Sequence, residues 1–123
     1  MVKRIIIVED DSSIQDAVRL ILEAEGFVVE SLHNGDALLK LHFAPPALFI
    51  LDKQLTGVDG LEVCSFLKSQ PMTRHIPVIM LSANPNIIKL AGAAGADGAL
   101  EKPFQMKALI AVVEKLVKAS VEF

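Results

Sequence analysis

Short apolar segments alternate with segments of helical periodicity along the chain. The apolar segments are rich in β-branched residues and do not alternate with period two, as expected for strands buried on both faces of a parallel sheet. The pattern predicts five strands, at Arg4–Val8, Phe27–Glu30, Leu48–Leu51, Ile76–Leu81 and, less strongly marked, Gly98–Leu100.

Helices are predicted between and after these strands. Between positions 14 and 22, apolar residues recur at helical spacing, and Gln15 falls among the polar residues of the other side. Asp11 or Ser12 can cap the start of this helix, and Gly26 stands where a glycine commonly follows a helix end. The remaining helices are expected at about Gly35–His42, Gly60–Ser69, Asn86–Ala94 and Gln105–Ala119.

Strict alternation of strands and helices predicts an α/β fold with a doubly wound parallel sheet, right-handed crossovers and helices on both faces. With 123 residues, the chain has the length of one such domain, and we expect a single domain over residues 1–123. At this length we expect the flavodoxin-like strand order 2-1-3-4-5. That order places a ligand site beyond the carboxyl ends of the first and third strands.

Composition and charge disfavour several classes of protein. Hydrophobic residues make up 52% of the chain, which suffices for a sizeable core, but no apolar run approaches the length of a membrane span. The N-terminus lacks the pattern of a signal peptide. A net charge of −3 without a basic stripe argues against direct nucleic-acid binding. The single cysteine, Cys64, fits a cytoplasmic protein without disulfides and a small residue of the core.

Polar residues stand where four of the predicted strands end. They are Glu9, Asp10 and Asp11 after the first strand, Asp52 after the third, Ser82 after the fourth, and Lys102 after the fifth. In the expected strand order the carboxylates crowd into one depression, where they repel one another unless a cation joins them. Mg²⁺ suits such an oxygen-rich site.

Phosphoryl transfer is the chemistry that this set of groups favours. Asp52 is placed to act as a nucleophile that forms an aspartyl phosphate, while Lys102 supplies a positive charge and Ser82 a hydroxyl donor. Each residue alone is typical of a loop charge or a helix cap, so the interpretation depends on their joint occurrence at strand ends.

Several segments resemble the receiver domain of bacterial two-component response regulators. They are Ile5–Asp11, Phe49–Asp52 followed by Leu55–Gly60, Ile76–Ala83, and Gly95–Asp97 leading to Glu101–Phe104. The resemblance covers about residues 3–118. It implies that Asp52 accepts a phosphoryl group from a sensor histidine kinase or phosphotransfer protein, with no turnover of an external substrate. It also implies a switch in binding to a downstream protein or effector domain.

The resemblance further implies roles for the residues around Asp52. Asp10, Asp52 and the backbone carbonyl of Gln54 would ligate Mg²⁺, and Glu9 would bind the ion through water. Ser82 and Lys102 would contact the phosphoryl oxygens, and the bond between Lys102 and Pro103 would be cis.

The chain departs from the family pattern at three places. Ala99 stands where the family has an aromatic switch residue, and the stretch between Ser82 and Lys102 is somewhat short. Thr56 replaces a common proline, a change that we expect to matter little. We therefore expect the phosphorylation chemistry to be intact. The readout, meaning the structural change that phosphorylation causes, is expected to differ from that of the family.

The readout is expected to run through Ser82 and the following loop, residues 83–86, into a shortened or loosely docked fourth helix. Ile87, Ile88 and Leu90 cannot all face inward. Two interpretations stay open: that one of them offers apolar surface to a partner, or that the helix packs two apolar faces.

Two polar residues near the site are expected to modulate its chemistry. Gln54 and Asn84 each stand two residues past a site residue, and we expect them to orient water so that the phosphorylated state has a finite lifetime.

Other functions compete with the receiver interpretation. A phosphatase of the dehalogenase type would need a second acid where Gln54 stands. A flavodoxin-type cofactor site would need a phosphate-binding loop after the first strand. A degenerate receiver, acting only as an interaction module, is kept open by Ala99.

Overall fold

The computed structural model describes residues 3–41 and 43–121, with the side chains up to residue 118. It contains one five-stranded sheet with the order β2-β1-β3-β4-β5, in which all neighbouring strands are parallel. The strands are β1 (Arg4–Val8), β2 (Val28–Leu32), β3 (Leu48–Asp52), β4 (Val78–Ser82) and β5 (Gly98–Glu101). The expected fold class and strand order are confirmed.

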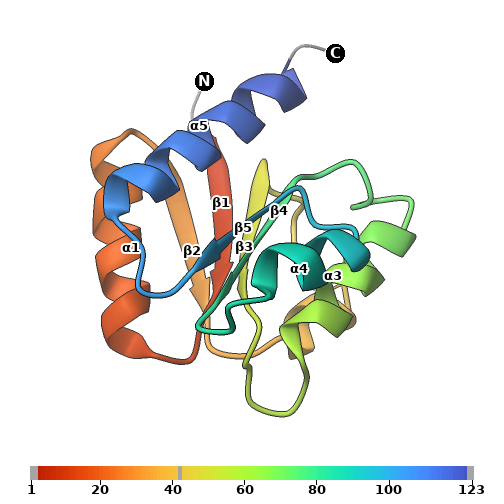
Figure 1. The fold of residues 1–123 in the computed structure, drawn as a ribbon. Coiled ribbons are helices and arrows are strands. Elements are labelled where there is room, and N and C mark those ends of the chain that lie inside the picture. Colours follow the sequence, from red (N-terminus) through yellow and green to blue (C-terminus); the bar gives the residue numbers. More distant parts are fainter. Residues whose placement is uncertain (1–2, 42, 122–123) are drawn as a thin grey trace.

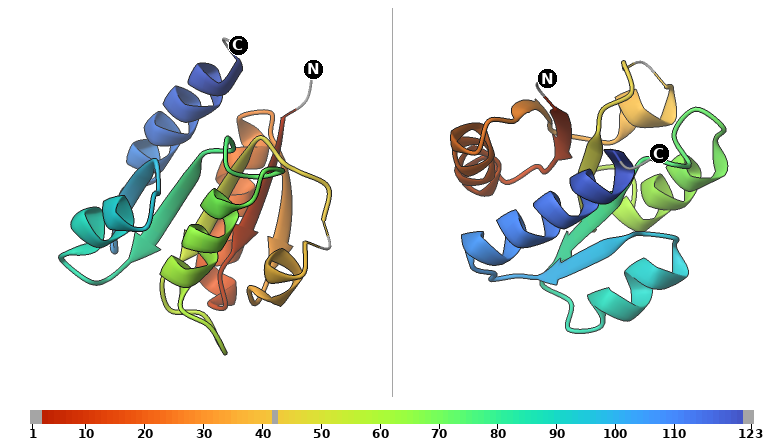
Figure 2. Two further views of the ribbon diagram at one scale, coloured as in Figure 1. Left: turned by 90° about the vertical axis from the view of Figure 1, so that its right-hand side faces the viewer. Right: turned by 90° about the horizontal axis from the view of Figure 1, so that it is seen from above.

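Helices follow the strands in alternation and cover both faces of the sheet (Figures 1 and 2). They are α1 (Ser12–Ala24), α2 (Asp36–Leu39), α3 (Gly60–Ser69), α4 (Ile87–Ala93) and α5 (Met106–Val121). Within the described ranges, none of these helices is long and apolar enough to cross a membrane.

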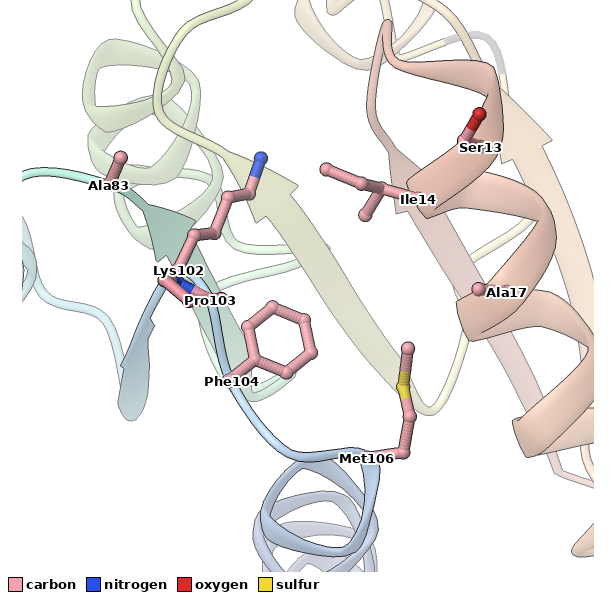
Figure 3. Close-up of a pocket in the computed structure, with 8 residues that line it drawn as sticks. All are labelled: Ser13, Ile14, Ala17, Ala83, Lys102, Pro103, Phe104 and Met106. Carbon is pink, nitrogen blue, oxygen red and sulfur yellow. The ribbon is translucent and has the colours of Figure 1, made fainter.

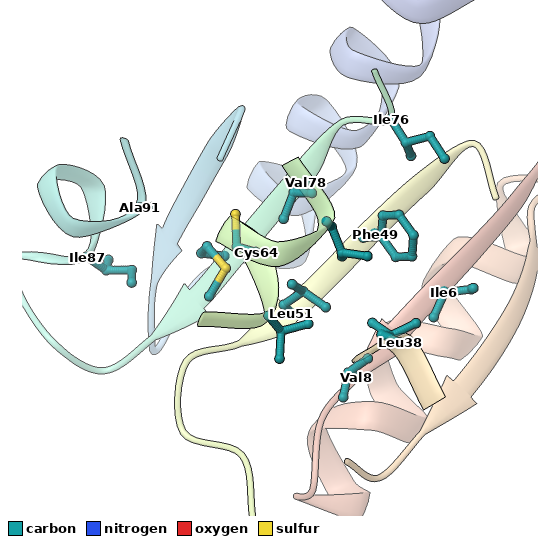
Figure 4. Close-up of a cluster of buried hydrophobic side chains, with 13 residues drawn as sticks. Ile6, Val8, Leu38, Phe49, Leu51, Cys64, Ile76, Val78, Ile87 and Ala91 are labelled. Carbon is teal, nitrogen blue, oxygen red and sulfur yellow. The ribbon is translucent and has the colours of Figure 1, made fainter. Parts of the chain in front are cut away.

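Two buried clusters flank the sheet because successive strand residues point to opposite faces. Ile6 and Val8 of β1 belong to the cluster under α2, α3 and α4, whereas Ile5 and Ile7 belong to the cluster under α1 and α5. Figure 4 shows the first cluster, in which Ile6 and Val8 lie near Leu38 of α2. Since β3 and β4 are buried along their whole length, the sheet centre is a rigid support for the residues at its carboxyl edge.

The first helix begins and ends as its sequence predicts. Asp11 is the cap residue, and its carboxylate accepts hydrogen bonds from the backbone N–H groups of Ser13 and Ile14. Gly26 has a φ of +95°, which a residue with a side chain rarely adopts. Cys64 is fully buried in the cluster under α3, as expected.

Several element bounds differ from the prediction. Strand β2 extends to Leu32 because this residue pairs with Val8 and its carbonyl accepts the N–H of Glu9. Strand β4 starts at Val78 rather than Ile76, whose N–H bonds instead to the carbonyl of Thr73 in a turn.

Helix α2 has only four residues, Asp36–Leu39, where a helix over Gly35–His42 was predicted. Leu41 adopts a φ of +56°, so the chain leaves the helical conformation there. His42 lies outside the described residues. Helix α4, at seven residues, is short as expected.

Candidate functional site

Three carboxylates meet at the carboxyl edge of the sheet. Glu9 and Asp10 follow β1, and Asp52 is the last residue of the neighbouring strand β3. One oxygen of each lies within 4.8 Å of the others. Glu9 and Asp52 are buried, whereas Asp10 is exposed. An oxygen-rich set that is buried on one side and open to water on the other fits a hard cation that keeps several water ligands.

Lys102 reaches this acidic cluster (Glu9, Asp10 and Asp52) from the far strand β5. Its Nζ lies 2.8 Å from Oε1 of Glu9 and 3.2 Å from Oδ1 of Asp52. Its backbone N–H donates to the carbonyl of Ser82, 2.7 Å away, which holds the loop after β5 against the end of β4. The bond between Lys102 and Pro103 is cis.

The electrostatics of the cluster follow from burial and from this ion pair. The pKa of Glu9 is raised from 4.5 to about 6, mainly by burial and also by the neighbouring Asp52. The hydrogen bonds from Lys102 and from the Asp11 backbone oppose this rise. Burial alone would lower the pKa of Lys102, but the hydrogen bond to Glu9 and the charge of Asp52 raise it above its ordinary value. Lys102 therefore stays charged throughout the physiological pH range.

Ser82 ends β4 at the same edge of the sheet and is 4% exposed. The β3–β4 register pairs Asp52 with Leu81, so Ser82 is one residue further toward the carboxyl edge. Its Oγ accepts the backbone N–H of Asn84 at 3.0 Å. The side-chain oxygen of Asn84 in turn accepts the N–H of Asn86 at 2.8 Å, at the start of α4.

The loop between β3 and α3 forms one wall of the site. Gln54 forms an isolated antiparallel bridge with Asp59, and its side chain is exposed. Thr56 donates a hydrogen bond from Oγ1 to Oδ2 of Asp10 at 3.1 Å. The Thr56 side chain thus contacts the acidic cluster directly, which its place in the sequence did not indicate.

Gln15 is a second contact that its sequence position did not predict. We expected this residue on the polar side of α1, but it is 5% exposed. Its amide nitrogen donates to the carbonyls of Glu9 and Leu32, both at 3.0 Å. Gln15 thus connects α1 to the ends of β1 and β2. The spacing of apolar residues along the helix did not indicate that this polar side chain is buried.

An apolar hollow of about 410 Å³ lies beside the site (Figure 3). Ile14 and Ala17 of α1 form one side, and the stem of Lys102 with Phe104 and Met106 forms the other. Because Lys102 also contacts Asp52, the hollow adjoins the acidic cluster.

A smaller hollow of about 210 Å³ lies between α4 and β5, with Ala99 and Ile88 in its lining. Ile87 is buried, whereas Ile88 is 73% exposed. One apolar residue of α4 therefore does face outward, as the sequence indicated.

Residues 5–114 match the family described as the response regulator receiver domain. The chain belongs to this family. The phosphate regulon transcriptional regulatory protein PhoB of Rhizobium meliloti is 39% identical over 121 residues, which are 96% of this chain and 53% of that protein. This receiver chain thus spans about half the length of the curated relatives it matches.

Solved receiver structures have the same fold. The signal receiver domain of a histidine kinase from Syntrophus aciditrophicus is 32% identical with a TM-score of 0.89, over 98% of this chain and 94% of that one. The receiver domain of a Pseudomonas aeruginosa sensor histidine kinase is 22% identical with a TM-score of 0.86, over 96% and 99% of the two chains. That structure holds a magnesium ion in its active site cleft, and its likeness to this chain shows the fold alone.

Proposed function

We propose that this receiver domain, comprising residues 1–123, accepts a phosphoryl group on Asp52 from a phosphohistidine of a sensor histidine kinase or phosphotransfer protein in the cytoplasm. The observation that carries the proposal is the position of Asp52: one of its oxygens lies within 4.8 Å of oxygens of Glu9 and Asp10, and Oδ1 lies 3.2 Å from the ammonium of Lys102. The domain turns over no external substrate, since the group that it accepts stays on its own side chain until water removes it.

The donor set of the acidic cluster fits Mg²⁺, which favours oxygen ligands and keeps some of its water. Asp10, Asp52 and the backbone carbonyl of Gln54 would hold the ion, and Glu9 would bind it through water. When bound, Mg²⁺ neutralises charge on the phosphoryl oxygens.

The transfer itself needs little from the chain except position and charge. A carboxylate oxygen of Asp52 attacks phosphorus, the phosphorus–nitrogen bond breaks, and its electron pair goes to the leaving imidazole. Lys102 stays charged and pairs with the phosphoryl oxygens. Ser82 donates a hydrogen bond from its hydroxyl to one of them.

The readout follows from the hydrogen bonds of Ser82. If its hydroxyl turns toward the phosphoryl group, the bond from the N–H of Asn84 is strained or lost. Asn84 also holds the N–H of Asn86, so the change passes into the start of α4 and alters the presentation of Ile88. This route needs no aromatic side chain at Ala99.

The phosphodonor docks on the hollow between α1 and the loop after β5. We assign this surface to an apolar helix that carries the phosphohistidine, because the hollow is lined by apolar side chains and adjoins the phosphoacceptor through Lys102. A histidine presented there lies beside Asp52, as an in-line transfer requires. The protein that responds to phosphorylation is proposed to bind elsewhere, at α4.

Mass spectrometry of the intact protein tests the proposal. After incubation with acetyl phosphate and magnesium, we expect a single phosphoryl adduct that is absent from Asp52→Asn and from a sample with chelator. A folded wild-type protein that takes up no adduct, or an equal adduct on the variant, would contradict the assignment of Asp52. The first of these results would favour an interaction module that works without phosphorylation.

A further inference from the structure

The β3–α3 loop carries a hydroxyl group that touches the acidic cluster. Oγ1 of Thr56 lies 3.1 Å from Oδ2 of Asp10, although 46 positions separate the two residues. Among the residues that the structure describes, Thr56 is the one side chain with a hydrogen bond to this carboxylate. Asp10 is the exposed member of the cluster, so burial does little to fix its orientation.

The loop that carries the exposed Thr56 is anchored on both sides. Leu55 and Val58, on either side, pack against the buried cluster under α3. Between them Gly57 has a φ of +87°, with open space where a Cβ would stand, so the chain turns there. The bridge between Gln54 and Asp59 closes the base of the loop.

The hydrogen bond leaves the metal-binding capacity of Asp10 intact. An ionised carboxylate has about four lone-pair positions on its two oxygens, and Thr56 occupies one of them. The hydroxyl is uncharged and therefore does not compete with a cation as an ammonium group would. Its effect is to restrain the rotation of the Asp10 side chain while an oxygen of that group stays within 4.8 Å of those of Glu9 and Asp52.

We propose that Thr56 is a positioning residue for the metal site: its hydroxyl orients Asp10 toward the cation that the acidic cluster binds. The inference rests on the Mg²⁺ site of the proposed function. Groups that hydrogen-bond a metal-ligating carboxylate commonly contribute about 10- to 100-fold to metal affinity. For an exposed pair we expect the low end of that range, about tenfold.

Calorimetric titration of the unphosphorylated protein with MgCl₂ tests the proposal without any phosphoryl transfer. Thr56→Val keeps the shape of the side chain and removes the hydroxyl, and should weaken Mg²⁺ binding about tenfold. Thr56→Ser restores the hydroxyl and should recover most of the affinity. In a background of Asp10→Ala, Thr56→Val should cause no further loss, because the group that Thr56 orients is then absent.

The possible failures are distinguishable. If the wild type binds Mg²⁺ and Thr56→Val binds it equally well or more tightly, the positioning role is wrong while the proposed function stands. A wild type that binds no Mg²⁺ overturns both the metal site and this inference. If Thr56→Ser binds Mg²⁺ as weakly as Thr56→Val, the hydroxyl is not the cause of the loss and the inference is overturned. If Thr56→Val weakens Mg²⁺ binding equally in the Asp10→Ala background, the hydroxyl does not act through Asp10, which overturns it as well.

Discussion

Lys102 and Glu9 form an ion pair across 93 positions of sequence, with 2.8 Å between Nζ and Oε1. Glu9 is fully buried, whereas the Lys102 side chain retains some exposure. The pair therefore places a positive charge at the inner wall of the acidic cluster before any phosphoryl group arrives.

Replacing Lys102 by Met is expected to slow phosphorylation by acetyl phosphate at least about tenfold, because the phosphoryl oxygens lose a fixed cation. Mg²⁺ affinity should stay equal or rise, since a competing positive charge is removed. The pKa of Glu9 should rise beyond its value of about 6, as Lys102 acts to lower it. Phosphorylation rates and Mg²⁺ titrations check these points, and an unchanged rate would remove Lys102 from the proposed mechanism.

Replacing Gly60 by Ala is expected to destabilise the protein by about 3 kcal/mol or more. A Cβ at Gly60 would lie 1.9 Å from the carbonyl oxygen of Asp52, so the start of α3 and the end of β3 must shift apart. Gly92→Ala is the matched control, because a Cβ there has open space and alanine favours the helix by about 1 kcal/mol. Urea unfolding of the two variants should show opposite signs.

The stability of the protein should fall at alkaline pH through Cys64. Burial raises the pKa of its thiol from 9.0 to about 11, with the charge of Asp97 adding to the rise and Lys68 opposing it. Between pH 9 and about pH 11 the Cys64 thiol loses its proton in the unfolded chain but keeps it in the folded chain. The contribution of this thiol to the free energy of unfolding is therefore highest below pH 9 and falls as the pH rises through this range. The expected slope is on the order of 1 kcal/mol per pH unit. Unfolding curves of Cys64→Ala should lack this part of the slope, and equal slopes would contradict the prediction.

Ser82→Ala should separate phosphorylation from its readout. The variant keeps Asp52 and Lys102 and is expected to be phosphorylated, at a reduced rate. In wild-type protein, NMR signals of the amides in loop 83–86 and α4 should shift on phosphorylation, whereas the variant should lose most of that shift. Ser69→Ala, an exposed serine of α3 whose hydroxyl donates to the carbonyl of Phe66, serves as the control. A full shift in the Ser82 variant would require another route to α4.

Gln54→Leu should lengthen the lifetime of the phosphorylated state several-fold. The exposed amide of Gln54 lies two residues past Asp52, and we expect it to orient the attacking water. In Asn84 the side-chain oxygen is engaged by the N–H of Asn86, so Asn84→Leu is expected to have a smaller effect on hydrolysis. Dephosphorylation followed by mass spectrometry gives both rates; if neither substitution alters its rate, the two residues do not modulate hydrolysis.

The sheet and the residues at its carboxyl edge were predictable because both depend on local patterns. Apolar runs mark buried strands, and a parallel sheet necessarily brings Asp10 and Asp52 to one edge. The contacts of Gln15 and Thr56 were not predictable, since each joins side chains or carbonyls far apart in sequence and leaves no periodic signal. Helix α2 ends early because Leu41 adopts a positive φ. A leucine rarely adopts this conformation, so the sequence did not predict the helix end.

The hollow between α4 and β5 has a spectroscopic consequence. The chain contains no Trp and no Tyr, so its intrinsic ultraviolet fluorescence is very weak. Ala99 and the exposed Ile88 both line this hollow of about 210 Å³. In Ala99→Trp, the single indole would lie beside α4, the helix that is proposed to change on phosphorylation. The time course of its fluorescence would then follow the structural change at α4 while the protein is phosphorylated.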